Sequence, residues 1–227
     1  MKRNDIHHIS IWAIAIISTL FVWWSAQFIL ASSFVTIDGL RSYSLFDDAM
    51  ISMRYAWNFS HGHGLVWNAG EYIQGYTNLL MVMIMSLITF FFSKTMSVLV
   101  VQMLGIFIML IIAGLSLGIG KTIFPDSNNI HDKVFGVVAF VCGLIYYPLV
   151  YWSLMGMETG LLSVFLLAGV FFALQYSRTS KLAFLFFFSG AGCLAFLTRN
   201  DSFIFFFILW VYLSVDKNVL RTNFSFR

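Results

Sequence analysis

The chain has 227 residues, of which 60% are hydrophobic, 19% aromatic and only 10% charged. A soluble domain carries about 25% charged residues, and a fold of this length could not bury so much apolar surface within itself. The composition therefore excludes a soluble domain and predicts a protein whose main solvent is lipid. The net charge of +3 is small and scattered, so no nucleic acid is expected as a partner.

The first apolar segment, residues 11–34, predicts a membrane span, because about 20 apolar residues cross the hydrocarbon core. A cleaved signal peptide is the alternative, since Lys2 and Arg3 precede the segment. The apolar stretch exceeds the 7–15 residues of a signal sequence, and no clear cleavage site follows it. We therefore expect an uncleaved span with residues 1–10 as a cytoplasmic tail.

The positions of the charges suggest how the rest of the chain crosses the membrane. Six further stretches are free of charge: Tyr72–Ser93, Thr95–Gly120, Val134–Met157, Thr159–Ser177, Leu182–Thr198 and Ser202–Val215. If all of them crossed, most Lys and Arg would lie outside, against the positive-inside rule. If Tyr72–Ser93 does not cross, most lie inside. We therefore expect an extracytoplasmic loop at 35–78, an interfacial or re-entrant helix at 79–93, further spans at 96–215 and a basic cytoplasmic tail at 216–227.

The densest polar run, Asp47–Asn58, carries the residues best suited to chemistry. On a helix, Asp47, Arg54 and Asn58 would share one face. A carboxylate there can take a proton from a hydroxyl, and a guanidinium can bind a phosphate through two hydrogen bonds. The alternative is that Asp47 and Asp48 only stabilise the N-terminus of a helix. Mg²⁺ or Mn²⁺ bound by these two carboxylates is a further open hypothesis.

Other polar or unusual residues admit two interpretations each. The glycine-flanked His61 and His63 predict a tight turn, with zinc binding a weak alternative. Thr77 or Asn78 could cap the helix that follows. Met81, Met83 and Met85 could line a groove for a prenyl chain, although helix packing is the stronger reading. Arg199 and Asp201 could pair with each other at the membrane interface or serve the reaction, and Cys142 and Cys193 are expected as small core residues.

Three motifs resemble a known family. Asp47–Asn58, Gly62–Glu71 and Gly75–Leu80 are similar to the first extracytoplasmic loop of polytopic GT-C glycosyltransferases, closest to the terminal arabinofuranosyltransferase-like branch. Gly156–Thr159 and Leu197–Asp201 follow in the family's order, with Asn200 where the family more often has proline. The likeness runs from about residue 10 to residue 215. Family members are longer, so the chain looks like their N-terminal part.

The resemblance implies an all-α fold: a polytopic transmembrane helical bundle of GT-C type, whose long first extracytoplasmic loop carries interfacial helices. It implies a multi-pass protein of the bacterial inner (plasma) membrane with its active site on the extracytoplasmic face. It further implies transfer of a sugar from a polyprenyl-phosphate donor to a glycan, lipid or protein acceptor, with inversion of the anomeric centre.

The resemblance also implies roles for individual residues. Asp47 would be the general base, with Asp48 beside it to orient the acceptor or a metal ion. Arg54 and Arg199 would bind the donor phosphate. The remaining residues expected in the substrate pocket are Tyr55, Asn58, His63, Asn68, Glu71, Tyr76, Thr77, Asn78, Glu158 and Asp201.

A different class of function stays open at this point: a non-catalytic membrane protein, such as a carrier of lipid-linked sugars, a flippase-like subunit or an accessory partner of a transferase. An ion channel or ordinary transporter is disfavoured, because it would need polar residues inside several spans. Here the polar residues lie almost wholly in the loops. The sequence does not identify the sugar or the acceptor.

Overall fold

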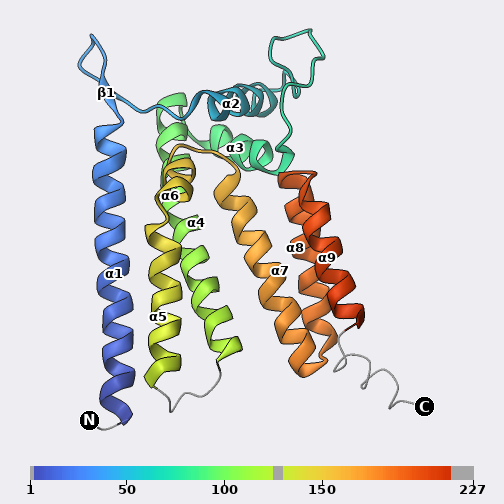
Figure 1. Ribbon diagram of the computed structural model, residues 1–227. Coiled ribbons are helices and arrows are strands. Elements are labelled where there is room, and N and C mark those ends of the chain that lie inside the picture. Colours follow the sequence, from blue (N-terminus) through green and yellow to red (C-terminus); the bar gives the residue numbers. More distant parts are fainter. Residues whose placement is uncertain (1–2, 125–129, 216–227) are drawn as a thin grey trace.

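The computed structural model describes residues 3–124 and 130–215, and it confirms the all-helical fold. Helices α1 (Arg3–Ala31), α4 (Lys94–Ile123) and α7 (Thr159–Thr179) have roughly parallel axes, and the chain runs along α4 and α7 in the direction opposite to α1 (Figure 1). Each is long and apolar enough to cross a membrane. Between them lie α5 (Ile130–Ile145) and α6 (Tyr147–Leu154), which together make one bent segment.

The bend between α5 and α6 is 51° and has a local cause. Pro148 sits in the first turn of α6, where the missing N–H interrupts the hydrogen-bond ladder that would join the two helices. If this bent pair is counted as one span, the described residues contain up to four candidate spans. Helix length and composition therefore support a multi-pass membrane protein.

The last two helices are shorter than the thickness of the hydrocarbon core of a bilayer. Helices α8 (Leu182–Thr198) and α9 (Ser202–Val215) have 17 and 14 residues. At about 1.5 Å per residue they reach about 25 and 21 Å, against about 30 Å of hydrocarbon. Length alone therefore supports fewer full spans than the charge-free stretches suggested.

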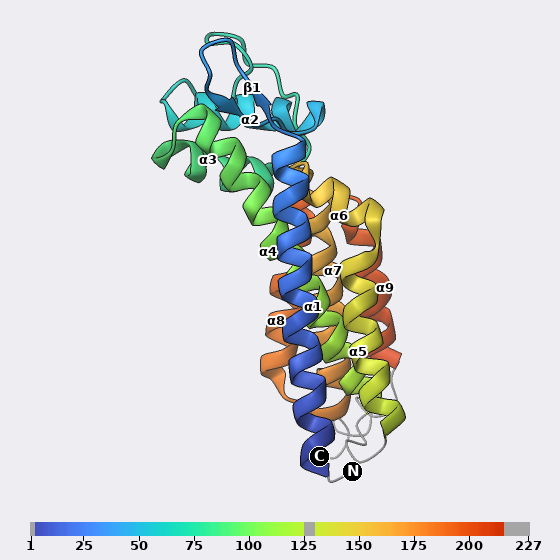
Figure 2. The ribbon, with the colours of Figure 1, turned by 90° about the vertical axis from the view of Figure 1, so that its left-hand side faces the viewer.

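A second layer, the transverse layer, lies across one end of the bundle that these helices form. It contains α2 (Asp47–Ser60), α3 (Leu79–Phe91) and a small antiparallel hairpin of β1 (Phe34–Val35) and β2 (Arg41–Ser42), as Figures 1 and 2 show. Helix α3 has only 13 residues and runs across the bundle rather than along it. The turn between α6 and α7 and the turn between α8 and α9 meet the same end of the bundle.

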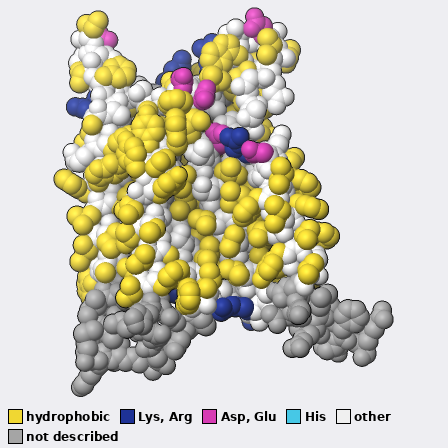
Figure 3. Space-filling view, in the orientation of Figure 1, with side chains coloured by type: hydrophobic (Ala, Val, Ile, Leu, Met, Phe, Trp, Pro, Cys, Tyr) yellow, Lys and Arg dark blue, Asp and Glu magenta, His cyan; other side chains and the backbone are white. Residues whose placement is uncertain are grey.

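Charge is divided between the two ends. Every Asp and Glu whose side chain is described lies at the α2–α3 end: Asp38, Asp47, Asp48, Glu71, Glu158 and Asp201. The same end also carries the cations Arg41, Arg54, Lys94 and Arg199. In the described part of the chain, all charged side chains at the opposite end are cations: Lys121, Arg178 and Lys181. Figure 3 shows both groups separated by a wide apolar belt. This distribution matches a protein that presents two different faces to water on the two sides of a membrane.

The outer surface of the belt is strongly apolar. Trp12, Trp23 and Phe186 are each more than 60% exposed, and many other large apolar side chains of α1, α8 and α9 face outward. Such a surface fits contact with lipid chains. Cys142 and Cys193 also lie on this surface, so the expectation that they are core residues is wrong. In lipid, a small weakly polar thiol can face outward at little cost, because the surroundings are as apolar as a core.

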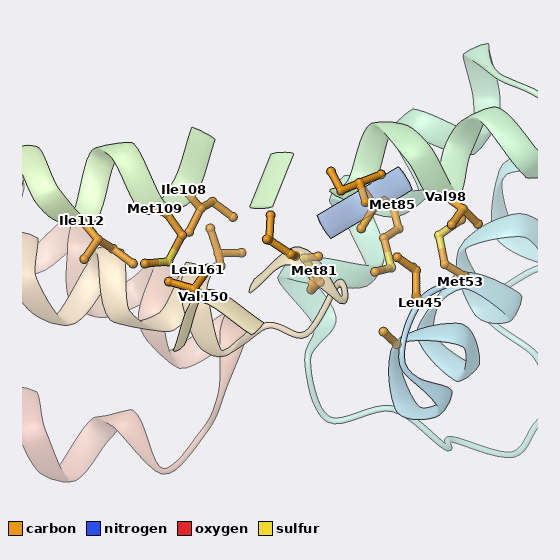
Figure 4. Packing of buried hydrophobic residues seen from close by; sticks show 14 of the residues in the cluster. Leu45, Met53, Met81, Met85, Val98, Ile108, Met109, Ile112, Val150 and Leu161 are labelled. Atoms are coloured by element: carbon orange, nitrogen blue, oxygen red, sulfur yellow. The ribbon is translucent and has the colours of Figure 1, made fainter. Parts of the chain in front are cut away.

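One hydrophobic core joins the transverse layer to the bundle. Figure 4 shows Met53 of α2, Met85 of α3 and Val98 of α4 packed together, continuous with Ile108 and Leu161 deeper in the bundle. Met81 and Met85 are almost completely buried there. They therefore form packing contacts and do not line an open groove for a prenyl chain.

Candidate functional site

One face of α2 forms the wall of a pocket with a volume of about 540 Å³. Asp47, Met50, Ile51 and Arg54 line it because they recur at the i, i+3, i+4 and i+7 positions of the helix. The remaining lining residues come from α2 itself, from α3 and α4 and from the loop after α2: Met53, Trp57, Trp67, Thr89, Lys94 and Val98. The pocket is thus mainly apolar, with one carboxylate and two cationic groups.

The two adjacent carboxylates differ in position. Asp47 is exposed and lines the pocket, and its Oδ1 accepts a hydrogen bond of 2.9 Å from the backbone N–H of Asp48. Asp48 is exposed but is not part of the pocket wall. The N-cap position belongs to Phe46, so both carboxylates occupy the first turn, where a negative charge is favoured by the helix dipole.

The described residues contain no group of three or more His, Cys, Asp or Glu side chains arranged for a metal ion. Asp47 and Asp48 offer two carboxylates. Magnesium sites often use one or two carboxylates together with substrate phosphates, so this pair fits only as part of a shared site.

The two cations of the pocket are each held over a tryptophan ring. Nε of Arg54 donates a 3.1 Å hydrogen bond to the carbonyl of Trp67, and its Cζ lies 5.6 Å from the centre of that ring. Nζ of Lys94 lies 4.8 Å from the ring centre of Trp57. Such cation–π contacts hold a charge in place without neutralising it. Among the described side chains, no carboxylate forms an ion pair with Arg54 or Lys94.

Lys94 was not predicted as a site residue. In the sequence it is simply the charge between two apolar stretches, 40 positions after Arg54. Its place in the pocket depends on how the start of α4 packs against α2. The only signal in the sequence was its predicted location on the same side of the membrane as Arg54.

Two residues expected in the substrate pocket instead fasten the loop that follows α2. Nδ2 of Asn58 donates to the carbonyls of Val66 and Trp67 at 2.8 and 2.9 Å. The hydroxyl of Tyr55 donates to the carbonyl of Ile73 at 2.8 Å, and its ring meets that of Tyr76 at 5.1 Å. Both Tyr55 and Asn58 are buried. They therefore position Trp67, and through it Arg54.

The other loop residues do not line this pocket. His63, Asn68, Glu71 and Thr77 are exposed, and Nδ2 of Asn68 donates to Oε2 of Glu71 at 3.0 Å. His61 stacks on Trp57 with ring centres 3.9 Å apart. None of these loop residues lines the pocket of Asp47 and Arg54.

A second polar cluster lies where the transverse layer meets the bundle. Nδ2 of Asn78 donates to Oε2 of Glu158 at 3.0 Å, and Asn78 also exchanges hydrogen bonds with Ser52 of α2. Asn78 occupies the N-cap position of α3 but makes no side-chain capping bond. Its amide instead joins α2 and α3 to the start of α7.

Arg199 completes this cluster. It lies 3.7 Å from the buried carboxylate of Glu158 and forms two hydrogen bonds, of 3.3 and 3.2 Å, with Asp201. Of the two interpretations left open for Arg199 and Asp201, the structure shows the pairing of the two side chains. With two carboxylates around it, the guanidinium carries less free charge for a phosphate than Arg54 does.

No known protein family, no curated protein and no solved structure matches this chain at a significant level. The likeness of Asp47–Asn58 to GT-C glycosyltransferases therefore stays a prediction. What the chain itself shows is an all-helical protein with candidate membrane spans. At one end it carries an apolar pocket bordered by Asp47, Arg54 and Lys94.

Proposed function

We propose that this protein is a GT-C-type membrane glycosyltransferase. It moves a sugar from a polyprenyl-phosphate donor to a glycan, lipid or protein acceptor on the extracytoplasmic face of the bacterial plasma membrane. The observation that supports this most is the pocket itself. It sets a carboxylate, Asp47, beside the cations Arg54 and Lys94 and an otherwise apolar lining, and a lipid-linked sugar phosphate presents the complementary groups.

In the proposed reaction, the Asp47 carboxylate takes the proton of an acceptor hydroxyl. The acceptor oxygen attacks the anomeric carbon while the bond between that carbon and the phosphate oxygen breaks. The bonding electrons leave with the phosphate, which becomes a monoester. Attack from the face opposite the leaving group inverts the anomeric centre, and the cation at Arg54 stabilises the departing charge.

A divalent cation fits this scheme in one place. Asp47 and Asp48 would hold Mg²⁺ or Mn²⁺ together with oxygens of the donor phosphate, and the ion would supply further positive charge there. Every proton and charge in the scheme above is already assigned to residues of this chain. An assay with and without EDTA tests whether the cation contributes.

The deciding experiment measures sugar transfer or hydrolysis from a panel of synthetic polyprenyl-phosphate sugars, with the purified protein in detergent. We expect Asp47→Asn to lower turnover by about 10²- to 10⁴-fold, the usual contribution of a general base. Asp38→Asn is the matched control, because Asp38 is an exposed carboxylate of the hairpin at the same end. Thermal unfolding checks that both variants fold.

Two outcomes would contradict the transferase. One is turnover by Asp47→Asn equal to that of the unmodified protein. The other is donor binding without any turnover by the unmodified protein, which would indicate a carrier of lipid-linked sugars, a flippase-like subunit or an accessory partner of a transferase.

A further inference from the structure

We infer that Lys94 and Arg54 together form a phosphate clamp that binds a lipid phosphate monoester more tightly than the corresponding diester. Lys94 is thereby a leaving-group-binding residue of the pocket. This inference rests on the proposed function for the identity of the donor. The clamp itself rests on the positions of the two cations.

The first step of the argument is that both cations border one cavity. Arg54 comes from α2 and Lys94 from the first turn of α4, and each lies over its own tryptophan, Trp67 or Trp57. Within the described part of the chain, neither side chain pairs with a carboxylate. Arg199 shows the contrast, because Glu158 and Asp201 surround it.

The second step concerns the form of the ligand. Most of the remaining cavity wall is made of apolar side chains, among them Met50, Ile51, Met53 and Val98. A free inorganic phosphate would gain nothing from these groups, whereas a phosphate carried on a hydrocarbon chain buries apolar surface against them. The pocket thus suits a phosphate that is attached to a lipid.

The third step is a charge balance. A lipid sugar phosphate is a phosphodiester with one negative charge. When the bond to the sugar breaks, the phosphate becomes a monoester with about 1.5 to 2 negative charges near neutral pH. An interaction that grows as this charge develops lowers the barrier, because it is stronger in the transition state than in the bound donor. Arg54 and Lys94 supply such an interaction, and Asp47 lines the same pocket. The three side chains carry a net charge of about +1 beside the diester, and of about +2 once Asp47 has taken the acceptor proton and the monoester has formed.

The test compares four probes that differ in one feature each: farnesyl phosphate, its methyl diester, farnesol and inorganic phosphate. Binding is measured by calorimetry with the full chain in nanodiscs of phosphatidylcholine. For the unmodified protein we expect the monoester to bind several-fold more tightly than the diester. Farnesol and inorganic phosphate should each bind weakly.

Lys94→Gln should weaken monoester binding by about tenfold and remove the preference over the diester, because it deletes one charged hydrogen-bond donor. Lys94→Arg should retain the preference. Lys121→Gln is the matched control, since Lys121 is an exposed lysine at the opposite end of the same helix. Thermal unfolding of each variant shows whether a loss reflects folding.

Three results would overturn the clamp: equal losses for monoester and diester in Lys94→Gln, the same loss in Lys121→Gln, or inorganic phosphate binding as tightly as farnesyl phosphate. The experiment distinguishes a failure of the proposed phosphate clamp from a failure of the proposed transferase activity. If monoester binding depends on Lys94 but no sugar is transferred, the clamp is supported and the transferase is contradicted. If sugar is transferred but Lys94→Gln does not change product binding, the transferase is supported and the clamp is contradicted.

Discussion

The side-chain amide of Asn78 donates a hydrogen bond of 3.0 Å to the carboxylate of Glu158, although 80 residues separate the two in the chain. Both side chains are buried, and the same amide group exchanges hydrogen bonds with Ser52. Three helices, α2, α3 and α7, therefore meet at one polar point. This link holds the transverse layer, with its pocket, on the end of the bundle.

Replacing Asn78 should loosen that link. In Asn78→Ala, the carboxylate of Glu158 and the hydroxyl of Ser52 each lose a buried partner, so we expect the free energy of unfolding to fall by about 1–3 kcal/mol. Thermal unfolding in detergent measures the loss, and hydrogen exchange in the first turn of α3 locates it. Thr77→Ala, at the neighbouring exposed residue, is the control. An equal loss of unfolding free energy in both variants would contradict the role assigned to Asn78.

The two carboxylates that pair with Arg199 should contribute unequally. Glu158 has an 8% exposed side chain, whereas that of Asp201 is 62% exposed. Solvent screens exposed pairs, which are worth about 0–1 kcal/mol, while removal of a buried partner costs more. We expect Glu158→Gln to lower the melting temperature clearly and Asp201→Asn to change it little. A larger decrease in melting temperature for Asp201→Asn than for Glu158→Gln would show that burial does not decide how much each carboxylate contributes to stability.

Packing of α4 against α6 depends on one glycine. A Cβ atom on Gly105 would overlap the backbone carbonyl of Ser153, a group that cannot move aside without shifting α6. Gly114 of the same helix has open space around its Cα. We expect Gly105→Ala to destabilise the protein. Gly114→Ala should match or slightly exceed the stability of the unmodified protein, because alanine favours a helix by up to about 1 kcal/mol over glycine. Melting temperatures of both variants decide this, and equal values would contradict close packing at Gly105.

The charge distribution predicts which end faces out of the cell. In a background with Cys142→Ala and Cys193→Ala, Asp38→Cys should react with a membrane-impermeant maleimide in intact cells. Lys181→Cys should react only after the membrane is permeabilised. Both parent residues are exposed, at opposite ends of the protein. The reverse pattern would place the pocket in the cytoplasm and remove the extracytoplasmic assignment.

The sequence by itself determined the solvent of this protein and the location of its apolar helices. Composition and the spacing of charges suffice for this, because the cost of placing charge in lipid acts on each segment separately. It also predicted the α2 face that carries Asp47 and Arg54, since a helix repeats every 3.6 residues whatever surrounds it. The charge-free stretches at 182–198 and 202–215 coincide with α8 and α9, whose 17 and 14 residues fall short of the about 20 residues of a typical span.

Only the tertiary structure decided which residues share a site. It brought Lys94 to the pocket of Arg54 and joined Asn78 to Glu158, and it turned Asn58 toward the loop at Trp67. These relationships depend on how α2 and α3 pack against the starts of α4 and α7. Such packing is set by the fit of many side chains at once, which no local pattern in the sequence records.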